Sequence, residues 1–303
     1  RRFVDGFAPI AFKGFAEMHS LELDLGENYR AGPLRLILSG FIEYFTPTSA
    51  FAAQQAGVEA VVPYIEAQDH NGRWTKVVEE MGFPAGLHRT MITDLSGRLP
   101  EGTRRIRITT NLMIYWDQVL IDTTADSPET RLNDVPLARA ELRRLGFPRM
   151  VEGHPKSDVR FDYSEVSQTG PYARHAGNFT RYGDVRALVA VAEDKFAVLA
   201  SGDEVALDFD PAELPPLPPG WMRDYFFYAD AFTKDMDFHA AQAFTVDPLP
   251  FHGMESYPYP SSKTYPQNLQ SLEYLLNYNT RQDRGGIPPT LRFEYQRRNP
   301  PLP

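Results

Sequence analysis

The segment Leu249–Pro260, with the sequence LPFHGMESYPYP, combines side chains that can do chemistry with residues that stiffen the backbone. His252, Tyr257 and Tyr259 are candidates for contact with a ligand, because imidazole and phenol groups both donate and accept hydrogen bonds. The three prolines of the segment favour an extended backbone in the residues before them. Aromatic rings in such a setting commonly lie on hydrophobic surface and bond through the hydroxyl. We therefore predict a structural strap, with ligand binding by these three side chains as the alternative.

Sugar binding is a second chemistry that the residue types allow. Aromatic rings stack on the apolar face of a pyranose, and the chain contains 20 Phe, 15 Tyr and 3 Trp. Trp74 follows the turn sequence Asn71-Gly72, a place where an exposed aromatic platform can lie. The alternative is that Trp74 covers one edge of a sandwich. Trp116, inside the run MIYWDQV, is expected to pack in the core.

Hydrolytic chemistry has weaker support. The sequence has no G-x-S-x-G nucleophile motif, which a Ser–His–Asp hydrolase of that class would need. A glycosidase needs two carboxylates that face each other across a cleft. Candidates lie on several predicted strands and their flanks, but with 40 acidic residues such pairs also arise by chance: Glu43, Asp69, Glu79, Asp117 and Asp122. Solvated or loop-capping carboxylates are the simpler interpretation.

Metal and thiol chemistry is restricted by composition. The chain has no cysteine, which excludes disulfides, zinc–thiolate sites, iron–sulfur clusters and thiol nucleophiles. Its seven histidines are isolated, without the paired spacing of a histidine metal site. His239 lies close to Asp235 and Asp237, where a cation site and a surface loop are both consistent with the sequence. A structural calcium bound by loop oxygens is the one cofactor expected, without assigned ligands.

Composition bounds the class of protein. With 303 residues, 42% hydrophobic and 23% charged, the chain is typical of a folded globular protein. A formal net charge of −9 argues against binding to nucleic acid or to an acidic membrane surface. No apolar run approaches the roughly 18 residues of a membrane span. The chain opens with RRFVDGFAPI, without a starting Met or a signal peptide, and we interpret it as a fragment or a processed form.

Apolar periodicity predicts a mainly β fold. The clearest hairpin is Val61–Gly82, where Asn71-Gly72 supplies the positive φ angles of a tight turn. Further strands are expected at His19–Gly26, at Pro33–Phe45, and on both sides of Thr110-Asn111 within Thr103–Asp122. Strands that recur about every ten residues suggest a β-sandwich or jelly roll.

Helical patterns are few. The best is Gln267–Asn279, in which four leucines form the stripe of an amphipathic helix: Leu269, Leu272, Leu275 and Leu276. A short helix is expected near Thr48–Ala56. In the second half, Leu137–Phe147 fits a strand or a helix, Asp184–Asp210 is expected to form three strands, and Pro211–Trp221 an extended connector.

An internal similarity suggests two related halves. LELDLG at Leu21–Gly26, LILSGFIEYF and FAAQQAG are followed later by VALDFD at Val205–Asp210, FFYADAFTKD at Phe226–Asp235 and HAAQAF. We interpret these as two β-sandwich units related by duplication, with chance similarity as the alternative. The polar stretch Thr123–Asp134 is the expected join. The predicted domains are residues 1–124 and residues 125–303, the second with the strap and the helix.

Several motifs, taken in order, resemble a known family. IYWDQ, FTRYGDVRALV, GDEVALDFD, PPLPPGW, YADAFTKDMD and PLPFHGMESYPYP are similar to the C-terminal region of bacterial FG-GAP repeat proteins of the ASPIC/UnbV-associated group. The resemblance covers nearly the whole chain and implies a large, often exported protein, but no activity. The D-x-D-x-D-G calcium loops and the ASPIC/UnbV module are absent from the sequence, so no metal or partner site is carried over. The N-terminal half also resembles galactose-binding-like jelly rolls, through GRWTKVV and LPEGTRRIRITTNLMIYWDQVLID.

These observations lead to an expected function. We expect a non-catalytic binding or assembly module of a larger extracytoplasmic protein, whether secreted, periplasmic or on the cell surface. Its ligand would be a partner protein or a surface glycan, contacted by Trp74, His252, Tyr257 and Tyr259. A carbohydrate-active hydrolase with paired carboxylates is one alternative. A purely structural C-terminal cap over an exposed sheet edge is the other.

Overall fold

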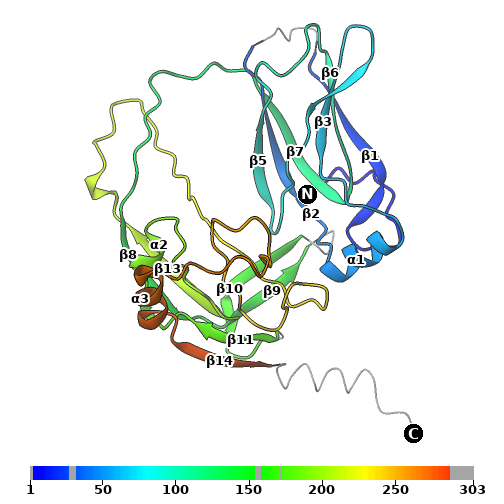
Figure 1. The fold of residues 1–303 in the computed structure, drawn as a ribbon. Coiled ribbons are helices and arrows are strands. Elements are labelled where there is room, and N and C mark those ends of the chain that lie inside the picture. The colour runs from blue at the N-terminus through cyan, green and yellow to red at the C-terminus, as the bar shows by residue number, and fades with distance from the viewer. Residues whose placement is uncertain (1–2, 27–31, 154–157, 171, 287–303) are drawn as a thin grey trace. The chain divides into compact units, whose positions relative to one another are not determined.

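The structure is a computed structural model, and it describes residues 3–26, 32–153, 158–170 and 172–286. It is mainly β, with antiparallel sheets and one short C-terminal helix, which confirms the predicted fold class (Figure 1). The chain divides into two compact units. Unit 1 comprises residues 1–130 and 150–161, and unit 2 comprises residues 131–149 and 162–303. In the described part, no helix has the length and apolar character to cross a membrane.

Unit 1 is built on two antiparallel sheets. The first has the strand order β1 (Phe15–Asp24), β6 (Arg105–Leu112), β3 (Tyr64–Gln68) and β4 (Trp74–Val78). The second has the order β5 (Arg89–Asp94), β2 (Arg35–Ile42) and β7 (Ile114–Asp122). Strands β6 and β7 follow each other directly, yet they belong to different sheets. The break between them lies at Met113, later than the predicted turn at Thr110-Asn111.

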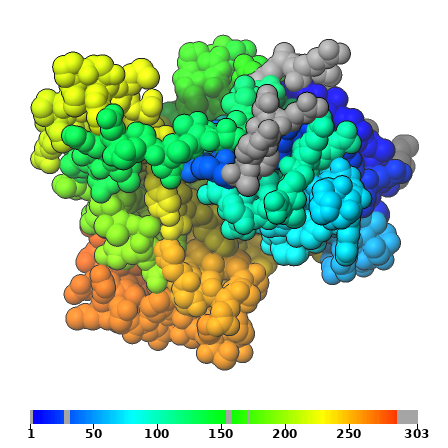
Figure 2. Space-filling view, turned by 90° about the horizontal axis from the view of Figure 1, so that it is seen from above, coloured from blue at the N-terminus to red at the C-terminus, as the bar shows by residue number. Residues whose placement is uncertain are grey.

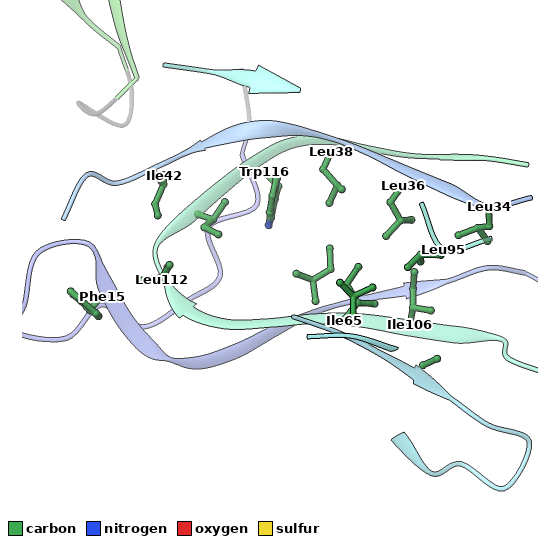
Figure 3. Close-up of a cluster of buried hydrophobic side chains, with 14 of the residues drawn as sticks. Phe15, Leu34, Leu36, Leu38, Ile42, Ile65, Leu95, Ile106, Leu112 and Trp116 are labelled. Carbon is green, nitrogen blue, oxygen red and sulfur yellow. The ribbon is translucent and has the colours of Figure 1, made fainter. Parts of the chain in front are cut away.

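The core of unit 1 lies between these two sheets (Figure 3). Alternate residues of each strand point inward, as period-two patterning requires. Buried side chains from β2 meet those from β3, β6 and β7 in one hydrophobic cluster: Leu36, Leu38, Ile42, Ile65, Ile106, Ile108, Leu112 and Trp116. The prediction that Trp116 packs in the core is confirmed. The opposite face of the β1–β6–β3–β4 sheet carries the polar side chains that alternate with these residues.

Two elements predicted for unit 1, a hairpin and a short helix, are confirmed, but the hairpin turn differs from the expected one. The loop between β3 and β4 spans residues 69–73, and Gly72 has a positive φ of 79° whereas Asn71 does not, so the expected positive φ at Asn71 is wrong. The carboxylate of Asp69 accepts hydrogen bonds from the backbone N–H groups of Asn71 and Arg73, which fixes the turn. The short helix α1 spans Pro47–Gln55 and begins after Thr46, whose hydroxyl accepts from the N–H of Ser49.

Unit 2 contains smaller sheets around a second core. One sheet has the order β12 (Gly183–Asp184), β8 (Leu137–Arg144) and β13 (Asp203–Phe209), and another pairs β11 (Arg174–Phe179) with β14 (Arg281–Gly286). The core includes side chains from β8 and β11, from the N-cap and interior of helix α2 (Arg186–Val189), from helix α3 (Leu269–Asn277), and from the strap and the chain just before it: Ala140, Leu142, Phe179, Val185, Leu188, Val246, Leu249 and Tyr274. Strands β9 (Phe147–Glu152) and β10 (Val159–Ser167) form a separate two-stranded sheet.

The strand predictions for Asp184–Asp210 are partly wrong. The last strand exists as β13, but the first is limited to the two residues of β12, and helix α2 (Arg186–Val189) follows it. Between α2 and β13 the chain has no strand. Its backbone bonds instead to the residue that follows β11: Val198 and Thr180 exchange two hydrogen bonds, through the Thr180 hydroxyl and its N–H. The Pro211–Trp221 stretch has one short 3-10 turn, η1 (Pro211–Glu213), and otherwise no helix or strand.

The segments paired by the proposed internal duplication have the same secondary structure in only one of the three pairs. LELDLG and VALDFD both lie in strands, β1 and β13. LILSGFIEYF contains β2, however, whereas Phe226–Asp235 forms neither strand nor helix. FAAQQAG lies in α1, whereas HAAQAF forms turns. The similarity of these later pairs is one of composition, and it does not specify a common fold.

Helix α3 confirms the predicted C-terminal helix but reverses its expected apolar face. Its N-terminus is capped by Asn268, whose side-chain oxygen accepts from the N–H of Ser271 at 2.8 Å. The buried residues are Ser271 and Tyr274, and Leu275 packs partly against the core. The other three leucines of the stripe are exposed, at 73% for Leu269, 48% for Leu272 and 76% for Leu276.

Candidate functional site

The strap, residues 249–260, packs on the core of unit 2, and its two tyrosines bond back to the chain at its start. Leu249 and Phe251 are buried in it. The hydroxyl of Tyr257 donates to the carbonyl of Pro248 at 2.8 Å, and that of Tyr259 donates to the carbonyl of Leu249 at 3.2 Å. The Tyr259 ring also meets the Phe251 ring edge to face, with centroids 5.0 Å apart. These contacts have the form of a structural strap.

Burial changes the acidity of the strap tyrosines. It raises the pKa of Tyr257 to about 12, with the nearby hydroxyl of Tyr259 as a smaller cause. Burial also raises the pKa of Tyr259. A phenol with a raised pKa stays neutral and remains a donor, because losing its proton in a poorly solvated position is unfavourable. Both hydroxyls are therefore held as structural donors to backbone carbonyls.

His252 has a different environment from the two tyrosines. Its Nδ1 lies 2.7 Å from Oδ1 of Asp194, and its Nε2 lies 2.8 Å from Oδ2 of Asp230. The backbone N–H of His252 also donates to Asp194, at 2.7 Å. Hydrogen bonds to Asp230 and then to Asp194 raise the pKa of His252, against a smaller opposing effect of desolvation. His252 thus joins two acidic segments to the strap.

Sequence reasoning missed both acidic partners of His252. Asp194 lies 58 residues before it and Asp230 lies 22 residues before it. Neither spacing belongs to a known motif, and 40 acidic residues provide many equivalent candidates. Only the tertiary fold distinguishes these two carboxylates from the others.

Asp230 lies near the end of a second feature, residues 221–232, which we call the aromatic segment. It runs without helix or strand between β13 and the strap, in the yellow part of the chain (Figure 1), and yellow residues lie at the molecular surface in the space-filling view (Figure 2). Four consecutive aromatic side chains within it are mostly exposed: Tyr225 at 64%, Phe226 at 90%, Phe227 at 68% and Tyr228 at 83%. Large exposed apolar groups of this kind mark interaction surfaces when they cluster.

The aromatic segment is held at both ends. At its start, the guanidinium of Arg131 lies 5.0 Å from the Trp221 ring centroid, and Arg223 donates to the carbonyl of Pro215 at 2.7 Å. At its end, Asp230 bonds to His252, and the Phe232 and Tyr257 rings pack with centroids 4.7 Å apart. Between these anchors, Phe227 contacts Phe209 of β13, with centroids 6.2 Å apart. The exposed rings therefore lie on a loop that is fixed by its surroundings.

Trp74, the other predicted site residue, lies in unit 1 at the start of the edge strand β4. It is half-buried, and the guanidinium of Arg107 lies over its ring, 4.3 Å from the centroid. Arg107 also forms a two-pronged ion pair with Glu66, at 2.6 and 3.1 Å. Next to them, Lys76 lies over the ring of Tyr64 at 4.2 Å. These side chains form a polar and aromatic row on the outward face of the sheet.

The carboxylates considered for hydrolysis each have another partner. Asp122 bonds to Arg35 and to the N–H of Thr124, Glu43 pairs with Lys13, and Glu79 pairs with Lys76. Asp117 faces His88 at 3.5 Å, a contact too long for a good hydrogen bond, and Asp69 fixes the hairpin turn. These environments are those of structural and surface carboxylates.

Surface depressions and groups of metal-ligating side chains indicate no further candidate site in the described residues. Two shallow depressions in unit 1, of about 450 and about 520 Å³, are lined around Asn111 and around His70 respectively. Neither is lined by Trp74. Within the described ranges, no group of three or more His, Asp or Glu side chains is arranged to hold a metal ion.

The four predicted site residues fall into two places. His252, Tyr257 and Tyr259 share the strap of unit 2, whereas Trp74 belongs to unit 1. Comparison with known proteins identifies no relative: no family model matches the chain, and neither the curated proteins nor the solved structures contain a significant match.

Proposed function

We propose that this chain is a non-catalytic binding and assembly module that docks on another polypeptide through the aromatic segment of unit 2. The exposure of Tyr225, Phe226, Phe227 and Tyr228 is the observation that carries the proposal. Aromatic residues are enriched at protein interfaces and are frequent among their hot spots. They supply a large contact area at a low entropic cost, because each has only two side-chain torsions.

The chemistry of the segment favours a protein partner over a sugar. The two most central rings belong to phenylalanine, which offers no hydrogen bond to a hydroxyl group. No charged side chain lies within Tyr225–Tyr228, as expected of an interface core, and Asp224 and Asp230 flank it as a polar rim. The exposed leucines of α3 show that unit 2 has a second apolar surface. The anchors at both ends reduce the ordering cost of binding.

The setting of the module is part of the proposal. We infer that it belongs to a larger extracytoplasmic protein, on the basis of the motif resemblance to the C-terminal region of bacterial FG-GAP repeat proteins. The acidic balance of the chain, with a formal net charge of −9, is consistent with a protein partner and unfavourable for nucleic acid.

Comparative capture tests the proposal. The purified chain is immobilised as wild type, as Phe226→Ser and as Tyr163→Ser, and each is exposed to an extract of the cells that produce it. Tyr163 is the matched control, because it is also an exposed aromatic residue, at 65%, and lies on β10. We expect one partner that wild type and Tyr163→Ser retain and Phe226→Ser loses. Equal retention by all three forms would rule out docking through the aromatic segment.

A second candidate function is glycan binding at Trp74. It is favoured by one specific arrangement: the Trp74 ring has Arg107 over one face, beside the Glu66–Arg107 ion pair and Tyr64. Polar groups next to an aromatic face are the elements of a neutral sugar site. A panel of sugars tested by thermal melting decides this, because a ligand at 100 times its Kd stabilises by about 2.7 kcal/mol. A sugar-specific rise in Tm that Trp74→Ala abolishes would support it, and a flat panel would reject it.

A further inference from the structure

We propose that His252 is a pH-dependent latch, which fastens the end of the aromatic segment to the strap when the imidazole is protonated and loosens it when the proton leaves. The latch concerns the chain alone and does not depend on what the aromatic segment binds.

The geometry of the imidazole supports the latch. Its two ring nitrogens lie 2.7 Å from Asp194 and 2.8 Å from Asp230, so both point at carboxylate oxygens. An ionised carboxylate can accept hydrogen bonds but cannot donate them. A ring with both nitrogens facing such groups must donate from both, and only the imidazolium ion carries N–H groups on both nitrogens. The observed arrangement is therefore complete only with a protonated ring. The Phe196 ring lies nearly parallel to the imidazole, at 11°, with the two centroids 6.3 Å apart.

The surroundings of His252 contain few other charges that could compensate. The strap contributes Glu255, which pairs with Lys263 at 2.7 Å. The segment around Asp194 contributes Glu193 and Lys195, which pair with each other at 2.7 Å. The groups that face the imidazole itself are the two carboxylates and the Phe196 ring. The negative charge of the two carboxylates favours the protonated imidazole, in agreement with the raised pKa of His252.

The two carboxylates are not held equally. Asp194 accepts from the backbone N–H of His252 as well as from its ring, and its own carbonyl accepts from the hydroxyl of Tyr265. Asp230 reaches the strap through Nε2 of His252. A neutral imidazole donates from one nitrogen, so the other presents a lone pair to a carboxylate at hydrogen-bonding distance. Whichever nitrogen keeps the proton, one of the two contacts becomes repulsive.

The direction of the pH dependence follows from the raised pKa. A group whose pKa is higher in the folded state stabilises that state fully below its unfolded pKa, near 6.5, and loses the contribution as the pH rises through the folded value. The latch is therefore closed below about pH 6.5 and weakens as the pH rises through the raised pKa of His252. Because the His252 side chain is half-exposed, we expect the opening of the segment to increase only about two- to fivefold.

Two measurements on the full chain test the latch. The first is an NMR titration of the His252 ring in wild type and in Asp230→Asn, which removes one negative charge but keeps an oxygen acceptor. We expect a wild-type midpoint above 6.5 and a lower midpoint in the variant. A wild-type midpoint at or below 6.5, or an unchanged midpoint in Asp230→Asn, would overturn the proposal.

The second measurement is hydrogen exchange of the backbone amides in residues 225–232, corrected for the intrinsic effect of pH on exchange. Wild type should open two- to fivefold more across the titration of His252, and His252→Gln should be open at every pH. His70→Gln is the matched control, because His70 is an exposed histidine in the unit 1 hairpin, and it should behave as wild type. Exchange that follows pH equally in wild type and His252→Gln would contradict the latch.

Discussion

Asp203 and Arg281, 78 residues apart in the sequence, form an ion pair in which the Asp203 side chain is completely buried, at 0% exposure. The pair joins β13 to β14, strands of two different sheets in unit 2. The hydroxyl of Tyr182 and the N–H of Ala200 also donate to the Asp203 carboxylate, at 2.9 and 2.8 Å. Arg281 in turn donates to the carbonyl of Thr180. The carboxylate is thus fully hydrogen-bonded.

We predict that Asp203→Ala severely destabilises unit 2. Removing one partner of a buried ion pair leaves an uncompensated charge and typically costs about 3–5 kcal/mol. Chemical denaturation followed by fluorescence would measure the decrease in the free energy of unfolding. Glu204→Gln is the control, since this neighbouring residue pairs with Arg143 at the surface, and we expect a cost of at most about 1 kcal/mol. Equal destabilisation by the two substitutions would show that the Asp203–Arg281 pair contributes no more to stability than a surface ion pair.

A second prediction concerns unit 1 in acid. The hydrogen bond from Arg107 is the largest cause that holds the pKa of Glu66 below its ordinary value of 4.5. A lowered pKa stabilises the fold above the unfolded pKa, and this contribution is lost as the pH falls through the folded value. Glu66→Gln should therefore lower stability by about 1 kcal/mol at neutral pH and by less below pH 4. Denaturation at both pH values checks this, and a cost that does not change with pH would contradict it.

A third prediction concerns Tyr257 of the strap and Tyr265, which follows the strap, in alkaline solution. Burial raises the pKa of both Tyr257 and Tyr265 to about 12, from an ordinary value of 10.0. Their neutral forms stabilise the fold fully below pH 10, and the contribution is lost as the pH rises toward 12. Absorbance titration should show phenolate formation that is delayed beyond pH 11 for part of the tyrosines. In Tyr257→Phe one late-titrating group should disappear, and loss of the bond to Pro248 should cost about 1 kcal/mol. An unchanged late phase would contradict the assignment.

Much of unit 1 follows from local sequence signals. The Asn71-Gly72 turn, the alternation in β1 and β2, and the apolar setting of Trp116 each depend on neighbours within a few residues. Such signals act through backbone preference and burial, which the sequence displays directly. The period-two pattern also indicates which face of each strand meets the core.

Unit 2 was harder to predict for physical reasons. The leucine stripe of α3 has helical spacing, yet Tyr274 provides the buried contact, because its hydroxyl reaches the carbonyl of Phe196 at 2.8 Å. The stretch Phe226–Asp235 has the aromatic composition of a strand, but it forms neither strand nor helix. The link from His252 to Asp194 and Asp230 joins three distant segments. Tertiary contacts decide all three cases, and a local pattern does not specify them.

The strap itself was predicted from its prolines and tyrosines, and its hydrogen bonds have the expected form. Tyr257 and Tyr259 donate to the backbone of the chain just before or within the strap. The sequence did not indicate that the adjacent aromatic segment would be the exposed part. A strand and an exposed loop can have the same composition, and burial alone separates them.

The most direct test of docking through the aromatic segment is a photo-cross-link from a defined position. A benzophenone amino acid replaces Phe226, which is 90% exposed, or Tyr163 as the control, and the protein is irradiated in the cells that produce it. The proposed function predicts one discrete cross-linked polypeptide from position 226 that position 163 does not give. Mass spectrometry would then identify the contacted surface. No cross-link at 226, or the same products from both positions, would contradict the account.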